Sequence, residues 1–181
     1  MKATLPNGSL REITDCYIDV PELSQKIIMK ILPDISDTKS ATYSDEPAIG
    51  RSFPIKNYSQ SDNRSISWTV HMMVCKEGDQ EDMISAMKLL EACVYPTQTE
   101  SPYAPPPICQ IRCGRLLTDD DQPLCCILKS YSIKFPTDVA WDENGYVPYK
   151  FDIDLTFEAV YDSKSLPYAE DIRLLGTSIG A

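Results

Sequence analysis

Histidine and glycine are both scarce in this chain, and their scarcity excludes several kinds of chemistry. Among 181 residues there are seven glycines and a single histidine, His71. A Ser–His–Asp hydrolase needs a histidine base, and the strand-like sequence around His71 favours a hydrogen-bonded residue on a polar face instead. Seven glycines leave little for phosphate-cradling loops, and neither a P-loop nor a G-x-G-x-x-G motif occurs. We therefore expect no enzymatic activity and no cofactor.

Long apolar runs and an excess of basic residues are also missing. The longest apolar runs, such as Leu124–Leu128, are far shorter than the ~20 residues of a membrane span, and no signal-peptide core follows Met1. Seventeen Lys and Arg stand against 27 Asp and Glu, a net charge of −10. Since affinity for phosphates comes from Lys and Arg, we expect neither specific nucleic-acid binding nor a membrane partner. The acidic balance suits a surface past which DNA slides without sticking, and plain solubility also explains it.

The seven cysteines show no spacing typical of a metal site. An odd number without a signal peptide predicts reduced thiols. Cys109 and Cys113 are four positions apart, whereas structural zinc usually takes two close pairs of ligands. Cys125 and Cys126 are adjacent, so a strand would point them to opposite faces. We expect small buried apolar cysteines and no bound metal.

A single helix is predicted from Asp79 to Tyr95. Asp79 can cap its N-terminus. Two acidic residues in the first turn suit the helix dipole, and Pro96 ends the pattern. Apolar residues recur at three- and four-residue spacing, which predicts one buried face; they are Met83, Ile84, Met87, Leu90 and Val94. We expect Met83, Met87 and Leu90 to pack the helix against a sheet.

The other regular segments are typical of strands in an antiparallel sheet, with the clearest alternation of apolar and polar residues from Ile66 to Val74. The predicted strands are Ile13–Val20, Lys26–Leu32, Arg64–Cys75, Ile108–Cys113, Leu124–Phe135 and Val147–Tyr161. Between them, Asp34–Pro47 is polar and predicts a loop or an arm, and Thr97–Pro107 predicts a stiff proline-rich connection. Asp119–Asp121, which lacks the spacing of an EF-hand, and Asn144–Gly145 predict turns.

The last predicted strand carries an acidic face. From Tyr149 to Ala159 apolar and polar residues alternate, so one face is dry and the other must stay wet. Asp152, Asp154 and Glu158 lie on the wet face, which either lines a water-filled channel or looks outward to solvent. Asp152 and Asp154 could also act as an acid–base pair, but no neighbouring residue predicts a pocket that would shift a pKa.

Five stretches then follow one another in an order that carries information: NRSISWTVHM, MKLLEACVYP, SPYAPPPICQIRCGRLL, CCILKSYSIKFP and PYKFDIDLTFEAV. In this order and spacing, the chain resembles the tail-tube fold of contractile-tailed bacteriophages and related contractile injection systems. It is most similar to the baseplate proteins that seat the tube, namely tube initiator and hub adaptor proteins. The resemblance covers roughly the segment from Tyr43 to Asp162.

The resemblance implies a mainly β fold, in which two packed antiparallel sheets form a tail-tube-like sandwich or barrel with one flanking α-helix. It implies a tail-tube-like domain at 43–162. Outside the resemblance, we expect N-terminal strands or an arm at 1–42, which can belong to the same domain, and a C-terminal arm at 163–181.

The function implied is structural. Copies made in the host cytoplasm would form a hexameric ring in the virion, at the tail baseplate, that initiates or extends the tail tube. Its partners would be other baseplate, hub and tail-tube proteins, and DNA would only pass through a channel lined by Asp152, Asp154 and Glu158. The alternative hypothesis is a monomeric β-barrel or β-sandwich binding module for a small ligand or a protein partner.

Overall fold

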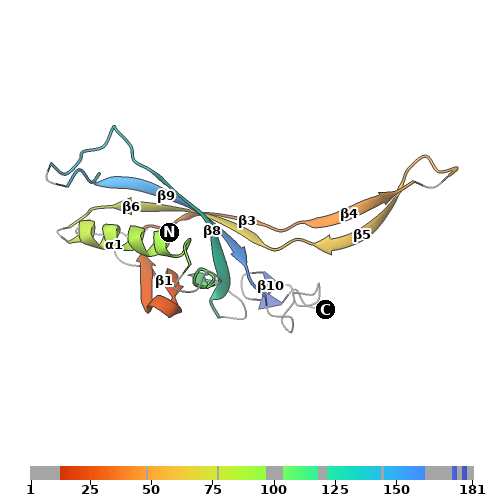
Figure 1. The fold of residues 1–181 in the computed structure, drawn as a ribbon, viewed down its shortest axis with the longest axis horizontal. Coiled ribbons are helices and arrows are strands. Elements are labelled where there is room, and N and C mark those ends of the chain that lie inside the picture. The colour runs from red at the N-terminus through yellow and green to blue at the C-terminus, as the bar shows by residue number, and fades with distance from the viewer. Residues whose placement is uncertain are drawn as a thin grey trace.

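The structure is a computed structural model that describes residues 13–47, 49–76, 78–96, 104–117, 122–143 and 145–161, together with 173–174 and 177–178. Its strands are β1 (Ile13–Val20), β2 (Gln25–Met29), β3 (Asp34–Thr38), β4 (Ala41–Glu46), β5 (Ile55–Ser61), β6 (Ser65–Met73), β7 (Cys109–Cys113), β8 (Leu124–Lys134), β9 (Lys150–Ala159), β10 (Arg173–Leu174) and β11 (Thr177–Ser178). Helix α1 spans Asp79–Ala92, and a single 3-10 turn, η1, spans Pro21–Leu23 (Figure 1). The predicted fold class, mainly β with antiparallel sheets and one flanking α-helix, is confirmed for the described part of the chain.

Seven strands form one antiparallel sheet in the order β2-β1-β7-β8-β9-β6-β3. β4 and β5 pair separately, as do the two short strands β10 and β11. Strands β2 and β3 follow each other in the chain but lie at opposite edges of the sheet, and only residues 30–33 join them. Since so short a link spans at most about 18 Å, the sheet must curl until its two edges approach each other.

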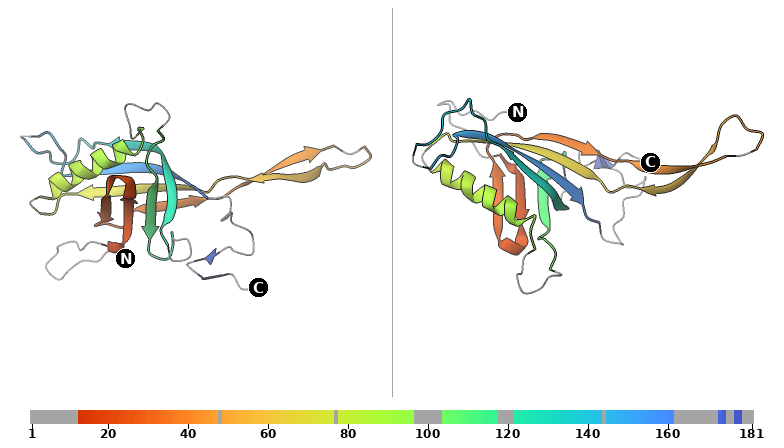
Figure 2. Two further views of the ribbon diagram at one scale, coloured as in Figure 1. Left: turned by 60° about the horizontal axis from the view of Figure 1, so that its bottom comes forward. Right: turned by 45° about the horizontal axis from the view of Figure 1, so that its top comes forward.

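Strand β8 provides the bend. Its first residues pair with β7, and Cys126 to Lys134 pair with β9. The register shifts between Leu128 and Ser130, which is the irregularity of a β-bulge, and bulges bend a strand and increase its twist. The two predicted layers are therefore continuous through β8, and β1 and β2 run at a steep angle to β6 and β9 (Figure 2).

The core lies between these two halves of the sheet. On β9 the residues Phe151, Ile153, Leu155, Phe157 and Ala159 are all buried. The antiparallel register places Ile66 of β6 opposite Phe157, so the dry faces of both strands point the same way. Cys16, Ile18 and Val20 of β1 belong to the same apolar cluster, so both halves share one core.

Helix α1 lies beside β1 and β6 (Figure 1). Its buried apolar residues are Met83, Ala86, Leu89 and Leu90, and Met87 is partly buried against the core. The helix ends at Ala92 rather than at Tyr95. The N-cap position is Gly78, with φ of 92°, so the prediction that Asp79 caps the helix is wrong. Glycine adopts this left-handed conformation at little cost, which frees the Asp79 side chain for other partners.

The polar segment Asp34–Pro47 is not simply a loop. It contains β3 and β4, which pair with β6 and β5 respectively. The loop interpretation is therefore wrong. The sequence did not reveal β4 because every residue of this strand is exposed, so apolar and polar residues do not alternate along it. The alternative, an arm, agrees with its position: β4 lies in a hairpin that protrudes from the sheet (Figure 1).

Some expectations fall on residues that the structure leaves undescribed. The aspartate turn at 119–121, Asn144 of the predicted hairpin turn, residues 1–12, residues 97–103 and most of the C-terminal arm at 163–181 lie outside the described ranges. Strands β1 to β3, from the N-terminal segment 1–42, belong to the same seven-stranded sheet as β6 to β9. The boundary proposed at residue 42 falls inside β4.

All seven cysteines are free, and five of them are buried. Burial raises the pKa of the Cys126 thiol to about 12, so this group stays protonated and unreactive. Cys125, its neighbour on the opposite face, is half-buried. The expectation of buried cysteines is wrong for Cys75, which is exposed because it lies in the turn between β6 and α1.

The proposed contact of α1 with the sheet leads to a first prediction. Leu90 is fully buried, so Leu90→Ala removes apolar contacts and leaves a cavity, at a cost of about 2–5 kcal/mol in the free energy of unfolding. Urea denaturation followed by circular dichroism measures this loss. The exposed neighbour Lys88, changed to Ala, is the matched control and should shift stability by less than about 0.5 kcal/mol. An unchanged midpoint for Leu90→Ala would show that this helix face is not part of the core.

Candidate assembly surface

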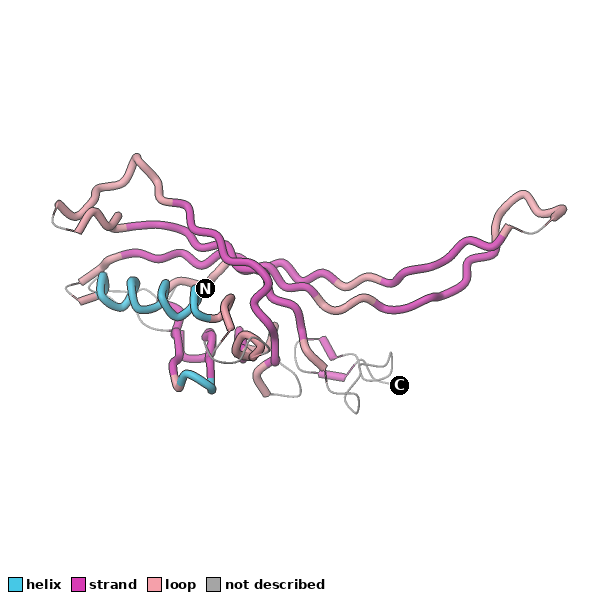
Figure 3. The backbone as a smooth tube through the Cα atoms, in the orientation of Figure 1, coloured by secondary structure: helices cyan, strands magenta, loops and turns pink. Residues whose placement is uncertain are grey.

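The β4–β5 hairpin, called the arm below, is an outward extension of the ladder formed by β3 and β6. β3 continues into β4 through Lys39 and Ser40, and β5 returns to β6 through residues 62–64 (Figure 3). At the joint, the backbone N–H of Asp62 donates to the Ser40 carbonyl at 2.9 Å. Every residue of both arm strands is exposed. An isolated two-stranded hairpin is marginally stable in water, so the arm needs support from side-chain pairs or from a partner.

Cross-strand side-chain pairs hold the arm together. Tyr43 and Tyr58 are opposite in register, and their rings meet edge to face with centroids 5.8 Å apart. Asn57 donates to the Glu46 carboxylate at 2.8 Å, and Lys56 forms an ion pair with Asp45. Exposed pairs of this kind contribute only about 0.2–1 kcal/mol each. They fix the register of the arm but leave its two faces available for contact.

The root of the arm, where it joins β3 and β6, is held more firmly than the paired strands β4 and β5. Arg64 forms a bidentate ion pair with Asp37, with Nε to Oδ1 and Nη2 to Oδ2 both at 2.9 Å. The Arg64 side chain is only 14% exposed, so this ion pair is better shielded from water than the side-chain pairs between β4 and β5. Asp62 accepts hydrogen bonds from the side chains of Ser40, Gln60 and Thr42, which lower the pKa of its carboxyl below the ordinary value. These contacts tie the arm to β3 and β6.

The tip of the arm, residues 47 and 49–54, exposes apolar side chains. Ile49 is 108% exposed and Phe53 is 81% exposed. Gly50 turns the chain with φ of 86°, a backbone conformation that residues with a side chain rarely adopt. Arg51 stands between the two apolar residues. The tip therefore presents two large apolar side chains and a guanidinium group outside the core.

The acidic residues of β9 share one face, as the alternation predicts. Asp152 and Asp154 lie opposite Lys134 and Ser132 of β8, and opposite His71 and Thr69 of β6. Residues directly opposite each other in an antiparallel pair point to the same side. The wet face is therefore shared by three strands and is not a purely acidic row.

Each of the three carboxylates has a polar partner. His71 Nδ1 lies 2.7 Å from Asp152 Oδ1, and Thr69 donates to Asp154 at 2.7 Å. Lys129 and Asn63 each donate to Glu158 at 2.7 Å, and these bonds keep the pKa of its carboxyl below the ordinary value. Sequence reasoning missed these partners because they come from other strands, and only the strand register brings them together.

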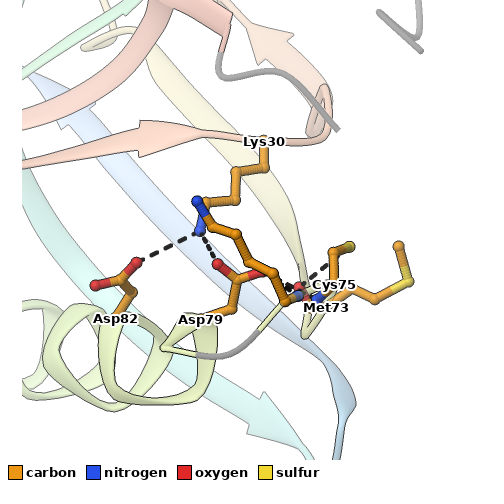
Figure 4. A network of polar contacts seen from close by, with 6 residues as sticks. Lys30, Met73, Cys75, Asp79 and Asp82 are labelled. Atoms are coloured by element: carbon orange, nitrogen blue, oxygen red, sulfur yellow. Dashed lines mark hydrogen bonds and ion pairs between the residues drawn. The ribbon is translucent and has the colours of Figure 1, made fainter. Parts of the chain in front are cut away.

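A second polar network anchors the start of α1 (Figure 4). The Asp79 carboxylate is 2% exposed and accepts Lys30 Nζ at 2.8 Å. It also accepts the backbone N–H groups of Cys75 and Lys76 at 2.9 and 3.0 Å. Burial alone would raise the pKa of Asp79, but these hydrogen bonds and the Lys30 charge lower it below the ordinary value. Because Lys30 directly follows β2, the network ties one edge of the sheet to the helix.

A cavity of about 400 Å³ lies next to this network, between β2, β6 and α1. Its floor is formed by Met29, Met83 and Leu89, which are nearly fully buried. Around it stand half-buried apolar residues that include Ile27 and Met72. Asp82 and Lys30 add charge at the rim. No sequence pattern predicts this cavity, because it forms only where the curled sheet brings β2 close to the second half of β6.

Among the described residues, no cluster of three or more His, Cys, Asp or Glu side chains can hold a metal ion. The same part of the chain has no helix with the length and apolar character of a membrane span.

No protein-family model matches the chain, and no curated protein matches its sequence. Among solved structures, one similar chain belongs to the tail of an empty GTA particle with C6 symmetry. The two chains are 14% identical, the alignment covers 84% of this chain and 96% of that chain, and the TM-score is 0.39. A likeness of this size carries no argument about function, which has to come from the residues of this chain.

The Lys30–Asp79 network leads to a second prediction. Asp79→Asn should lower the free energy of unfolding by about 1–3 kcal/mol at pH 7, because Lys30 loses its buried charged partner and keeps only the exposed carboxylate of Asp82 at 3.5 Å. Since the folded pKa of Asp79 is depressed, its contribution is complete above the unfolded pKa of about 3.9 and is lost as the pH falls through the folded value. The gap between wild type and variant should therefore narrow at low pH.

Urea denaturation at pH 7 and at pH 3 measures this gap. Glu81→Gln, which removes an exposed carboxylate from the same helical turn, is the control and should leave stability nearly unchanged at both pH values. A gap that stays constant with pH would assign the effect of Asp79→Asn to something other than its charge.

Proposed function

We propose that this chain is a structural protein of a phage-like tail, and that its copies assemble through their arms. The observation that carries the proposal is the arm itself, a hairpin that lies outside the core and exposes large apolar side chains at its tip. A hairpin without a core of its own gains stability when it packs on another surface. Its own protomer offers none, because the arm points away from the sheet (Figure 1).

The finer proposal is a hexameric ring that initiates or extends the tail tube as a baseplate tube initiator or hub adaptor, with other baseplate, hub and tube proteins as partners. It is supported by the order of strands and helix that resembles the tail-tube fold. Ring closure would also cover β2 and β3, the edges of the seven-stranded sheet, and unpaired edges otherwise invite aggregation. The role proposed is non-enzymatic, in a virion tail.

Removal of the arm tests the assembly. In the variant, an Asn-Gly turn replaces residues 41–61, so that β3 and β6 form a short hairpin. Because the deleted strands bury no core residue, the variant should fold and keep its near-UV circular dichroism. Light scattering coupled to gel filtration should show a concentration-dependent oligomer, and negative-stain microscopy should show rings, for the wild type but not for the variant. A wild-type chain that stays monomeric at every concentration would contradict the proposal.

The wet face of β9 is proposed to line the channel of that ring. Asp152, Asp154 and Glu158 would then repel DNA phosphates and let DNA pass without retention. Changing all three to Lys should leave the protein folded and make the assembled rings bind DNA, with an affinity that falls steeply as salt increases. Fluorescence anisotropy with a labelled duplex at several salt concentrations measures this gain.

A control variant separates position from net charge. It carries Lys at three exposed carboxylates outside the β9 face, which change the total charge equally: Glu22, Glu81 and Glu91. If the channel is lined by the β9 face, the β9 variant should bind DNA more tightly than this control at the same salt. Equal affinity of the two assembled variants would place the β9 face on the outside.

The alternative function, a monomeric binding module, is favoured by one observation, the cavity of about 400 Å³. Ligand pockets generally measure about 300–1,000 Å³, and the volume of this one falls within that range. A strictly monomeric wild type whose melting temperature rises with a small apolar ligand would support this alternative.

A further inference from the structure

Two cysteines that are far apart in the chain meet inside the sheet. Cys16 of β1 lies directly opposite Cys113 of β7, and their thiols form a hydrogen bond with the sulfur atoms 3.5 Å apart. Both side chains are buried, with Cys16 1% and Cys113 7% exposed. The proposed assembly through the arms uses neither thiol.

The position of this pair in the ladder brings the two side chains close together. The backbone N–H of Gly114 donates to the carbonyl of Asp15 at 2.7 Å, so the hydrogen bond joins residues that flank the two cysteines rather than the cysteines themselves. Residues in such a non-hydrogen-bonded pair have Cα atoms about 4.5 Å apart, and their side chains approach closely. A disulfide accepts Cα separations of about 4.4–6.8 Å, so a bond between the two sulfur atoms requires little movement of the backbone.

The two thiols differ in reactivity. Cys16 Sγ donates its hydrogen to Cys113 Sγ, and this bond lowers the pKa of Cys113 below its ordinary value while it raises the pKa of Cys16. Cys113 therefore more readily becomes a thiolate, which is the form that attacks disulfides. It is the last residue of β7, and the exposed residues Arg115 and Leu116 follow it in a turn. Opening of this turn alone would expose Cys113 to an oxidant.

A second thiol pair lies deeper in the core. Cys93, directly after α1, shares a side-chain hydrogen bond with Cys109 of β7, and both side chains are fully buried. Cys126, opposite Cys109 on β8, is also fully buried. An oxidant reaches these three thiols only when the core itself opens. We therefore expect Cys16 and Cys113 to react first.

We propose that Cys16 and Cys113 are an oxidisable pair, whose disulfide locks β1 to β7. With oxidised glutathione as the oxidant, Cys113 loses its proton to water, and its thiolate attacks one sulfur of the glutathione disulfide and releases one glutathione thiolate. Cys16 then loses its proton, and its thiolate attacks the Cys113 sulfur of the mixed disulfide and releases the second glutathione thiolate. The protein gives up two electrons and two protons, and the oxidant becomes two glutathione thiols.

The disulfide would hold one edge of the sheet. Strands β2 and β1 form the edge, and four residue pairs between β1 and β7 join them to the remaining strands of the seven-stranded sheet. A bond between residues 97 positions apart also reduces the entropy of the unfolded chain. A protein made in a reducing cytoplasm and released in a particle meets oxidising surroundings, where disulfides persist. This setting rests on the proposed function, whereas the thiol pair itself does not.

Oxidation followed by peptide mapping tests the pairing. The reduced full chain is incubated with oxidised glutathione, and the remaining thiols are blocked with N-ethylmaleimide in denaturant. The exposed Cys75 is changed to Ser beforehand, because it would itself form a mixed disulfide. Trypsin cleaves after Arg112 and Arg115, which separates Cys113 from Cys109. Mass spectrometry should find the peptide that contains Cys113 linked to the peptide that contains Cys16.

Melting curves test the lock. In the Cys75→Ser chain, oxidation should raise the melting temperature by at least about 5 °C, because the bond closes a long loop of the unfolded chain. Adding Cys16→Ser should abolish this rise. Adding Cys125→Ser, which removes a half-buried thiol outside the pair, is the matched control and should preserve it. Each variant is compared with itself before and after oxidation, so a loss of stability from the substitution itself does not enter the comparison.

The outcomes decide between the thiol pairs. A link between Cys16 and Cys113 together with a higher melting temperature supports the proposal. Recovery of both cysteines as blocked thiols, or a bond that forms first between Cys93 and Cys109, overturns it, and a link without a rise in melting temperature overturns the lock. The peptide map substitutes neither partner, so it holds even if Cys16→Ser does not fold. None of these outcomes depends on self-association, so this proposal and the proposed assembly fail separately.

Discussion

The buried face of β9 holds the two halves of the curled sheet together, because β9 pairs with β8 on one side and β6 on the other. Phe157 meets Trp68 of β6 edge to face, with ring centroids 5.9 Å apart, and both side chains are fully buried. Phe151 contacts Phe135, just after β8, with centroids 5.6 Å apart. The bend in β8 then brings β7, β1 and β2 over the same apolar surface. Helix, sheet edges and arm all take their positions from this arrangement.

Polar side chains hold the open side of the curled sheet, where β2 lies close to β6. Because β2 approaches β6 without pairing to it, the link between β2 and β3 has to be fixed by side chains. Lys30 provides this fixation by binding Asp79 at the start of α1, and Asp79 in turn accepts two backbone N–H groups of the preceding turn. A buried carboxylate is tolerable here because all its partners are present. The cavity beside the network is what remains of the gap between the two edges.

The sequence predicted the elements that have one dry face and failed where both faces are wet. Strand β9 and the apolar face of α1 were recognisable, since burial imposes a period of two or of about 3.6 residues. Strand β4 carries no such period, because each of its residues is exposed. The sequence also did not predict which residues pair with the carboxylates of the acidic face of β9. Period two places Asp152 and Glu158 on one side, but only the register with β6 and β8 brings His71 and Lys129 to them.

In the proposed assembly, the direction of the arm matters more than the arm's own stability. The exposed side-chain pairs of the arm stabilise it by only a few kcal/mol in total. A hairpin that moved freely would lose much conformational entropy on docking. The bidentate pair of Arg64 with Asp37, together with the three side-chain hydrogen bonds to Asp62, reduces that freedom where the arm leaves the sheet. If copies assemble through their arms, as proposed, the root of the arm sets the angle between neighbouring copies, and this angle decides whether they close into a ring or continue as a filament. Under that proposal, the contacts of Asp37, Ser40, Asp62 and Arg64 at the root of the arm determine the geometry of the assembly, while the exposed apolar side chains of the tip contribute to how tightly neighbouring copies bind.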